Sequence, residues 1–387
     1  MPVPTIVPVS TARQRRQFIE LPWALHRGDP NWIPPLRAVH KGLVGYRPHP
    51  FYRTGQAQTF LAYCEDEVCG RVAAILNHDH NQYYAERRGF FGFFECIDDQ
   101  EVAHGLLHAV REWFEARGIR HLRGPVNPGF EYSAGVLVEG FDSPPAFGMV
   151  HNPPHYPRLL EAFGFAKCED LLAYQAHIQM LPAFTAGLRP LAQRIKERFD
   201  IRVRRLSRWQ FFREAEEFLS VYNRSMVDHW GFYPMSREEI LHLGRQFRFL
   251  MVPDFTLGAE IDGKLVGFAI GLPDYNPRLK QLDGRLWPFG FLRLLSRKRE
   301  LQKLRIMAVN VIPEYQRLGI PLVLTDAMVP SVIEWGIQEI EYSWILESNP
   351  RSHANLEKVG TQLLKRYRIY DWNPPDDKVL LTEGQPR

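Results

Sequence analysis

The two halves of the sequence carry the same landmarks in the same order, which points to a duplicated unit. In each half a tryptophan is followed by a glycine, an isoleucine and a short apolar strand, and later by an Asn-Pro pair and a helical pattern that ends on glycine. The matching positions are Trp113, Gly118, Ile119, Leu122, Asn152, Pro153, Leu160, Glu161 and Gly164 in the first half, and Trp335, Gly336, Ile337, Ile340, Asn349, Pro350, Leu356, Glu357 and Gly360 in the second. Such a repeat indicates two copies of one structural unit. We therefore predict two domains, residues 1–190 and 191–387; the alternative is that a coincidence of helix and strand patterns produces part of the match.

Inside each half the patterns indicate an α/β (α+β) fold. Phe60–Tyr63 and Gly70–Leu76 flank a charged turn, while Phe255–Glu260 and Leu265–Leu272 flank Asp262-Gly263, a dipeptide that favours tight hairpins. Apolar residues at helical spacing follow these strands. Of the 387 residues, 45% are hydrophobic and 24% are charged, which suffices for packed cores and excludes a disordered chain.

Composition also limits which cellular compartments and which partners are expected for the protein. A net charge of +4 over this length is too small to indicate a nucleic-acid partner. The N-terminus lacks a signal-peptide pattern and no apolar run approaches a membrane span, so we expect a cytoplasmic protein. The four cysteines form no Cys-x-x-Cys pair, and we expect reduced thiols. The spacing of the His78/His80 and His151/His155 pairs predicts no metal site.

The segment Val309–Pro321 places a strand, a polar loop and the start of a helix in direct succession. A helix start of this kind leaves backbone N–H groups free at the positive end of the helix dipole, an arrangement that binds phosphate and pyrophosphate. Gly319 would let the backbone approach such a ligand, and Arg317 adds positive charge. The alternative is an ordinary connection in which Gly319 serves only the geometry of the turn.

This segment resembles the acetyl-CoA-binding core of the GNAT family of acyl-CoA N-acyltransferases. The matching residues are Val311-Ile312-Pro313, Gln316-Arg317-Leu318-Gly319, Asn349, Glu357-Lys358 and Gly360. The resemblance, which covers residues 205–370 well and 50–180 in outline, implies tandem GNAT-like units. Each would be a mixed, mostly antiparallel sheet flanked by helices and splayed at the acyl-CoA site, with a degenerate N-terminal copy.

The resemblance also implies acyl-CoA as co-substrate and names its contacts. The expected contacts are Val309, Val311, Gln316, Arg317, Leu318, Gly319, Ile320 and Asn349. A backbone N–H between Val309 and Val311 would stabilise the negative charge that develops on the thioester oxygen. For Asn349 the alternative is a cap on the following helix, where Pro350 takes the first position.

The sequence matches the catalytic residues of the family less fully than the residues that contact CoA. Pro321 removes one backbone donor from the expected phosphate loop, and Leu356 stands where many family members have a tyrosine as general acid. Tyr367 and Tyr370 are the nearby candidates for that acid, with packing as the alternative role. Glu347 is the candidate general base, the alternative being a solvated carboxylate at the end of a strand.

Residues Arg285–Arg299 combine Trp, Phe and Leu with five arginines and lysines. This composition is typical of a helix in a membrane interface, the alternative being a basic helix that packs its apolar side on the core. We therefore expect peripheral contact with the inner membrane and an amphiphilic amine as acceptor.

Proteins with this two-copy layout resemble the bacterial ceramide synthase group, which N-acylates sphingoid long-chain bases. The markers are Asp29-x-x-Trp32-Ile33-Pro34-Pro35, Trp230-Gly231-Phe232, Leu272-Pro273-Asp274 and Trp344-Ile345-Leu346-Glu347. The resemblance implies transfer of a long-chain fatty acyl group from acyl-CoA to a sphingoid base. Two alternatives stay open: acetylation of a small amine or peptide, and a catalytically inactive CoA- or lipid-binding module, which Pro321 and Leu356 favour.

Overall fold

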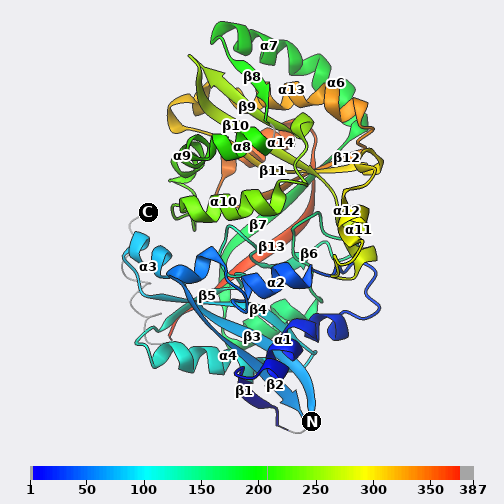
Figure 1. The fold of residues 1–387 in the computed structure, drawn as a ribbon. Helices are drawn as coiled ribbons and strands as arrows, with labels where there is room; N and C mark the ends of the chain where they lie inside the picture. Colours follow the sequence, from blue (N-terminus) through cyan, green and yellow to red (C-terminus); the bar gives the residue numbers. More distant parts are fainter. Residues whose placement is uncertain (1–2, 207, 375–387) are drawn as a thin grey trace. The chain divides into compact units, whose positions relative to one another are not determined.

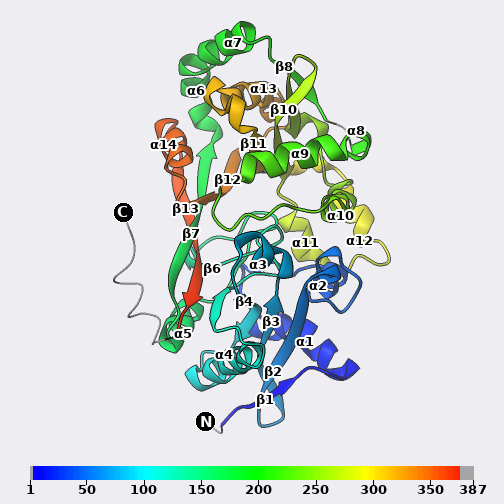
Figure 2. The ribbon, with the colours of Figure 1, turned by 90° about the vertical axis from the view of Figure 1, so that its left-hand side faces the viewer.

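The computed structural model describes residues 3–206 and 208–374, which form two compact units (Figures 1 and 2). Within the described residues, the first unit comprises 3–171, 282–285 and 365–374, and the second comprises 172–206, 208–281 and 286–364. The units are therefore not the two halves of the sequence, because the end of β7 (Ala166–His177) belongs to the second unit and most of β13 (Gln362–Trp372) belongs to the first. The boundary at residue 190, which concerns the duplicated copies, stays a prediction.

The first unit is a mostly antiparallel sheet between helices. Its elements are β1 (Thr5–Pro8), α1 (Ala12–Leu25), α2 (Arg37–Leu43), β2 (Gln56–Cys64), β3 (Glu67–Leu76), α3 (His78–Tyr84), β4 (Arg88–Cys96), α4 (Gln100–Glu115), β5 (His121–Gly124), β6 (Val136–Glu139), α5 (His155–Phe163), the start of β7 (Ala166–His177) and most of β13 (Gln362–Trp372). The strand order is β1-β2-β3-β4-β5-β13, with β6 also paired to β13. Among these pairings of the described residues, β4 with β5 is parallel and the others are antiparallel.

Alternation along β3 explains why helices cover both faces of this sheet (Figure 2). A side chain at Gly70 would meet Leu106 of α4, whereas the next residue, Arg71, reaches the carbonyl of Phe18 in α1. Successive side chains of a strand point to opposite faces, so α4 and α1 pack on opposite sides.

The second unit has the same architecture around its own core. Its elements are the end of β7, α6 (Leu181–Gly187), α7 (Arg189–Arg198), β8 (Arg202–Arg205), α8 (Arg208–Arg213), α9 (Ala215–Met226), α10 (Arg237–Phe247), β9 (Thr256–Ile261), β10 (Lys264–Pro273), α11 (Asn276–Leu282), α12 (Gly290–Leu295), β11 (Lys303–Val311), α13 (Ile320–Glu334), β12 (Glu339–Leu346) and α14 (Pro350–Lys358). The strand order is β7-β12-β11-β10-β9-β8. The predicted hairpin is confirmed: Asp262 and Gly263 both have positive φ, as a tight two-residue turn between β9 and β10 requires. The expected mixed, mostly antiparallel fold class is confirmed as well.

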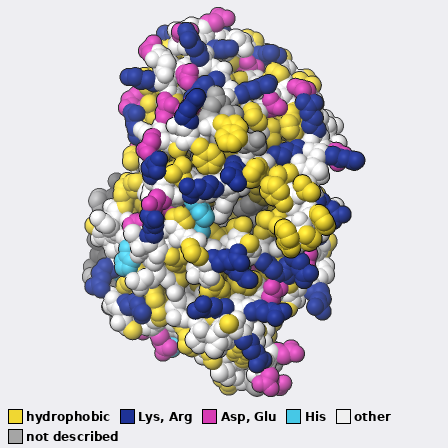
Figure 3. Space-filling model, in the orientation of Figure 1, with side chains coloured by type: hydrophobic (Ala, Val, Ile, Leu, Met, Phe, Trp, Pro, Cys, Tyr) yellow, Lys and Arg dark blue, Asp and Glu magenta, His cyan; other side chains and the backbone are white. Residues whose placement is uncertain are grey.

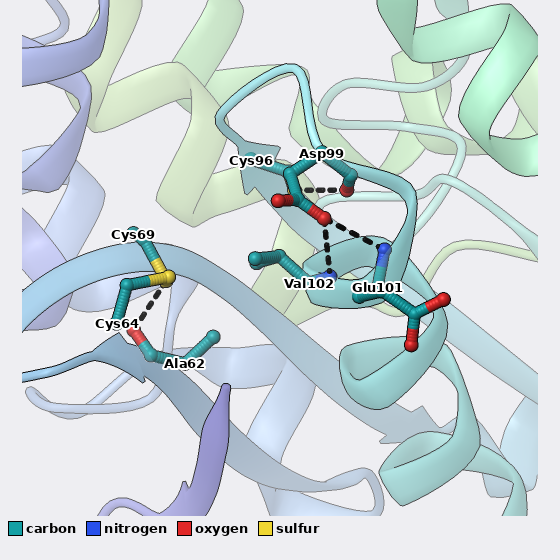
Figure 4. Close-up of a disulfide and its surroundings, with 7 residues drawn as sticks. All are labelled: Ala62, Cys64, Cys69, Cys96, Asp99, Glu101 and Val102. Atoms are coloured by element: carbon teal, nitrogen blue, oxygen red, sulfur yellow. Dashed lines mark hydrogen bonds between the residues drawn. A yellow bond between two sulfur atoms is a disulfide. The ribbon is translucent and has the colours of Figure 1, made fainter. Parts of the chain in front are cut away.

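Two of the four cysteines are paired, contrary to the expectation of reduced thiols. Cys64 and Cys69 form a disulfide across the β2–β3 hairpin, with their Cα atoms 5.9 Å apart (Figure 4). The strand partner of Cys64 is Glu67, and Cys69 is the extra residue where the pairing of β2 with β3 shifts register. The proximity of the two sulfur atoms therefore depends on the hairpin and its bulge and not on a Cys-x-x-Cys spacing. Cys96 and Cys168 are free, and burial raises the pKa of the Cys168 thiol to about 12.

Candidate functional site

Strands β11 and β12 of the second unit part from each other halfway along their length. They pair in parallel from Lys303 and Glu339 as far as Ile306 and Tyr342, and both strands then continue without further pairing to each other in the described residues. At the same point the pairing of β11 with β10 shifts register, so that Met307 is an extra residue on β11. Such a bulge bends a strand and increases its twist. The expected splay is therefore present.

A buried polar network holds the two strands together where they part. The guanidinium of Arg305 donates to the hydroxyl of Ser343 at 2.9 Å and to its carbonyl at 3.1 Å, and that hydroxyl donates to Glu341 at 2.6 Å. Arg305 and Ser343 are both buried. These residues were not predicted from the sequence, although charged residues at inward positions of apolar strands are a signal that could have identified them. Buried polar networks of this kind fix one geometry, here the starting point of the opening.

The backbone of β11 directs some of its groups toward this opening. Ile312 donates its N–H to Val266 of β10 at 3.0 Å. Because alternate residues of a strand direct their backbone groups to opposite edges, Val309 and Val311 direct theirs toward the open edge. The side-chain amide of Gln316 donates to the Val311 carbonyl at 3.2 Å, which agrees with that direction. The N–H of Val309 is thus placed where a carbonyl oxygen in the opening would accept it.

The loop after β11 leads into an uncapped helix start. Gly319 has φ of +78° and is the N-cap of α13, and no side chain of the described residues caps this end. Arg317 is exposed beside it, and Pro321 lies in the first turn, where its missing N–H breaks no helical bond. Glu314 in the same loop pairs with Arg224. The free N–H groups and the positive dipole end suit a pyrophosphate.

The equivalent place in the first unit is filled by the protein itself. The carboxylate of Asp99 caps α4, accepting from the N–H groups of Glu101 at 2.8 Å and Val102 at 3.3 Å (Figure 4). Glu101 adds further negative charge, whereas Asp98 is paired with Arg158. An anionic ligand would therefore meet an occupied and repulsive helix end, which agrees with the expected degeneracy of this copy.

In the first unit, the chain itself fills the space between β4 and β5 that would correspond to this opening. Beyond the parallel pairing of β4 with β5, Val126 donates its N–H to the carbonyl of Phe91 at 2.8 Å, and Asn127 accepts from the N–H of Phe93 at 2.6 Å. A Cβ at Gly92 would lie 1.7 Å from the Val126 carbonyl oxygen, so the chain leaves no space there. Of the two units, only the second combines an open strand pair with an open helix start.

Two of the predicted site residues, Glu347 and Asn349, lie between the end of β12 and the start of α14. Asn349 accepts from the N–H of Ser352 at 3.2 Å and so caps α14, which confirms the capping alternative. Glu347 is exposed in the turn between β12 and α14. His353 of α14, which the sequence analysis missed, bonds the Leu346 carbonyl at 2.8 Å and the hydroxyl of Tyr174 at 3.0 Å. Tyr174 comes from β7, so the first half of the sequence helps to hold the end of β12.

Tyr367 and Tyr370 lie in the first unit and are fully buried there. The hydroxyl of Tyr370 donates to Glu161 of α5 at 2.8 Å, and burial, together with that carboxylate, raises its pKa well above the ordinary value. The ring packs in the core formed with Phe91 and Phe114. These contacts favour the packing alternative for Tyr370.

Residues 3–206 and 208–374 contain neither a metal-binding cluster nor a membrane-spanning helix. No group of three or more His, Cys, Asp or Glu side chains in that part of the chain is arranged to hold a metal ion. Nor does it contain a helix with the length and apolar character that crossing a bilayer requires.

Comparison with known proteins agrees with this geometry. The description of the acetyltransferase (GNAT) family matches residues 215–361. Protein YghO of Escherichia coli is 33% identical over 365 residues, covering 92% of each chain, and a Caulobacter vibrioides protein named bacterial ceramide synthase is 30% identical over 377 residues, covering 95% of this chain and 97% of that one.

Solved structures confirm the tandem arrangement. A tandem GNAT protein of the clavulanic acid biosynthesis pathway superposes with a TM-score of 0.57 at 13% identity, covering 95% of this chain and 98% of that one. A GCN5-related N-acetyltransferase from Sphaerobacter thermophilus gives a TM-score of 0.51 at 13% identity over 97% of both chains. The chain therefore belongs to the GNAT family of acetyltransferases, and is an acyltransferase whose fold implies a CoA thioester as co-substrate.

Proposed function

We propose that this enzyme transfers a long-chain fatty acyl group from acyl-CoA to the primary amine of a sphingoid base, at the cytoplasmic face of the inner membrane. The observation that carries the proposal is the open β11–β12 pair beside the uncapped start of α13. The 30% identity to bacterial ceramide synthase over almost the whole of both chains supports the acceptor, because a ceramide is an N-acylated sphingoid base.

In the proposed site, some groups bind CoA and others take part in the reaction. The backbone amides from Arg317 to Ile320 and the Arg317 guanidinium hold the pyrophosphate of CoA, and Val309 donates its N–H to the thioester oxygen. In this proposal the pantetheine arm of CoA contacts the side chains of Gln316, which bonds the Val311 carbonyl, and Asn349, which also caps α14. Glu347 takes the proton of the ammonium group.

The reaction balances with these groups alone. The free amine attacks the thioester carbonyl carbon, a C–N bond forms, and the C–S bond breaks. The second proton of the nitrogen passes to the departing sulfur, so the products are an amide and the CoA thiol. No tyrosine is required for this step, which is consistent with Leu356 at the position where many family members have one.

The length of the acyl group that the enzyme prefers tests the proposal of a long-chain substrate. With sphinganine as acceptor, we expect kcat/KM for palmitoyl-CoA to exceed that for acetyl-CoA by at least about tenfold, since a single methylene in an apolar pocket is worth about that much. Product formation by mass spectrometry measures this ratio. Preference for acetyl-CoA together with a small polar amine would establish the alternative activity instead, and absence of thermal stabilisation by any acyl-CoA would remove the long-chain proposal.

A pair of variants separates the proposed base from a packing residue. We expect Glu347→Gln to lower kcat by about a hundredfold with little change in the KM for acyl-CoA, because loss of a general base acts on the chemical step. Tyr370→Phe should keep kcat within about twofold while lowering the free energy of unfolding by about 1 kcal/mol, the worth of its bond to Glu161. Steady-state kinetics and urea unfolding distinguish the two; the reverse pattern would make Tyr370 the catalytic group.

A further inference from the structure

Three large apolar side chains lie close together in sequence on the surface of the second unit. Trp287 is 88% exposed, Phe289 is 73% exposed and Leu292 is 67% exposed. Figure 3 shows a group of apolar side chains on the visible face near the position of α11 and α12 in Figure 1. Single exposed apolar residues are common, whereas a contiguous group indicates a surface that binds something.

This exposed group is held by a rigid support. Leu294, on the other side of α12, is buried, and Phe291 contacts Phe249 edge to face at 5.2 Å. Arg278 is buried and donates to the carbonyls of Leu294 at 3.0 Å and Arg297 at 2.7 Å. The alternative of a helix that packs all its apolar side on the core therefore applies to Leu294 and not to the three exposed residues.

Positive charge surrounds the apolar group. Arg293 is exposed and forms no salt bridge within the described residues. The side chain of Arg297 is 81% exposed and 3.4 Å from Glu300, and that of Arg299 is 65% exposed and 2.8 Å from Glu334. Ion pairs this exposed hold their partners weakly, so a stronger anion can displace the glutamates.

We propose that Trp287, Phe289 and Leu292 insert into the surface of a bilayer that carries anionic lipids, while Arg293, Arg297 and Arg299 bind lipid phosphates. Tryptophan and phenylalanine favour the headgroup region, and each arginine near an anionic leaflet adds attraction. A second copy of the chain fits less well, because two such surfaces would bring like charges together. The evidence for this docking surface comes from the exposed residues and does not depend on the proposed acyl-transfer site.

Vesicle flotation of the full-length protein tests the proposal. We expect binding to phosphatidylcholine vesicles that contain phosphatidylglycerol, and weaker binding to phosphatidylcholine alone. W287S/F289S/L292S should reduce the partition coefficient at least about tenfold, because apolar burial is lost. R293Q/R297Q/R299Q should reduce it by about fivefold for each charge at low salt, and by less at high salt. Lys298 is left unchanged because it donates to the Phe249 carbonyl and supports the segment.

A matched variant keeps the test specific to this surface. V227S/I333S removes other exposed apolar side chains of the second unit, 50% and 59% exposed, and should bind vesicles like the wild type. Flotation that survives both triple substitutions would overturn the proposal, as would a dimer in light scattering that the W287S/F289S/L292S variant dissolves. Acyl transfer to a detergent-dispersed amine, measured in the same variants, should be unchanged, so that a failure of docking is distinguishable from a failure of the proposed function.

Discussion

Gly319→Trp is expected to abolish CoA binding and acyl transfer. The backbone at Gly319 has φ of +78°, and a Cβ there would lie 2.8 Å from Cδ1 of Ile195 in α7. The indole would then be forced over the free N–H groups at the start of α13. Losing two charge-assisted hydrogen bonds to a pyrophosphate corresponds to at least about 3 kcal/mol, or more than about a hundredfold in Kd. Calorimetric titration with CoA measures the loss directly.

Two further variants show whether the effect belongs to the loop or to a general loss of structure. Gly319→Ala introduces backbone strain of about 1–2 kcal/mol and the same close Cβ contact with the end of the Ile195 side chain, but it adds nothing that reaches the amides, so CoA binding should largely persist. Arg317→Glu changes an exposed side chain and should weaken CoA by about tenfold or more without altering thermal stability in the absence of ligand. If the Gly319→Trp variant binds CoA with wild-type affinity, the CoA site lies elsewhere in the chain. The start of α4 in the first unit is a poor alternative site, because Asp99 already caps it.

Local signals in the sequence predicted the parts of the site that short segments determine. The succession of strand, loop and helix from Val309 to Pro321 is present, and Gly319 adopts the left-handed conformation that favours glycine. The Asp262-Gly263 turn and the cap at Asn349 are equally local, because each depends on two to four consecutive residues. Patterns at this range are set by backbone sterics and nearby hydrogen bonds.

Features that join distant segments could not be predicted in the same way. Arg305 and Ser343 meet only because β11 and β12 are neighbours in the sheet. His353 likewise forms a hydrogen bond with Tyr174, which belongs to the other half of the sequence. The bulge at Met307 depends on how β11 aligns with β10. Neither the periodicity nor the composition of any one segment contains this information, since register is fixed by the partner strand.

Removal of residues 365–387 is expected to unfold the first unit, although these residues end the second half of the sequence. The side chains of Tyr367, Ile369 and Tyr370 on β13 are fully buried in the first unit. Truncating one large buried side chain costs about 2–5 kcal/mol, so losing three approaches or exceeds the whole stability of a typical domain, about 5–15 kcal/mol. Circular dichroism and amide hydrogen exchange of the truncated chain should report this loss.

The same exchange of strands predicts how the two halves behave when separated. A fragment 1–190 lacks β13, and with it the Asp371 carboxylate that Arg123 binds through two bonds of 2.7 Å; a fragment 191–387 lacks β7, the neighbour of β12. Each fragment alone should therefore be unfolded or aggregated, whereas coexpression should restore a folded pair, because each supplies the strand that the other needs. Leu363→Ala, at a β13 residue that is 41% exposed, should leave the full chain within about 0.5 kcal/mol of the wild type. An independently folded 1–190 fragment with native-like hydrogen exchange would show that the unit closes its sheet without β13, and would support residue 190 as a folding boundary.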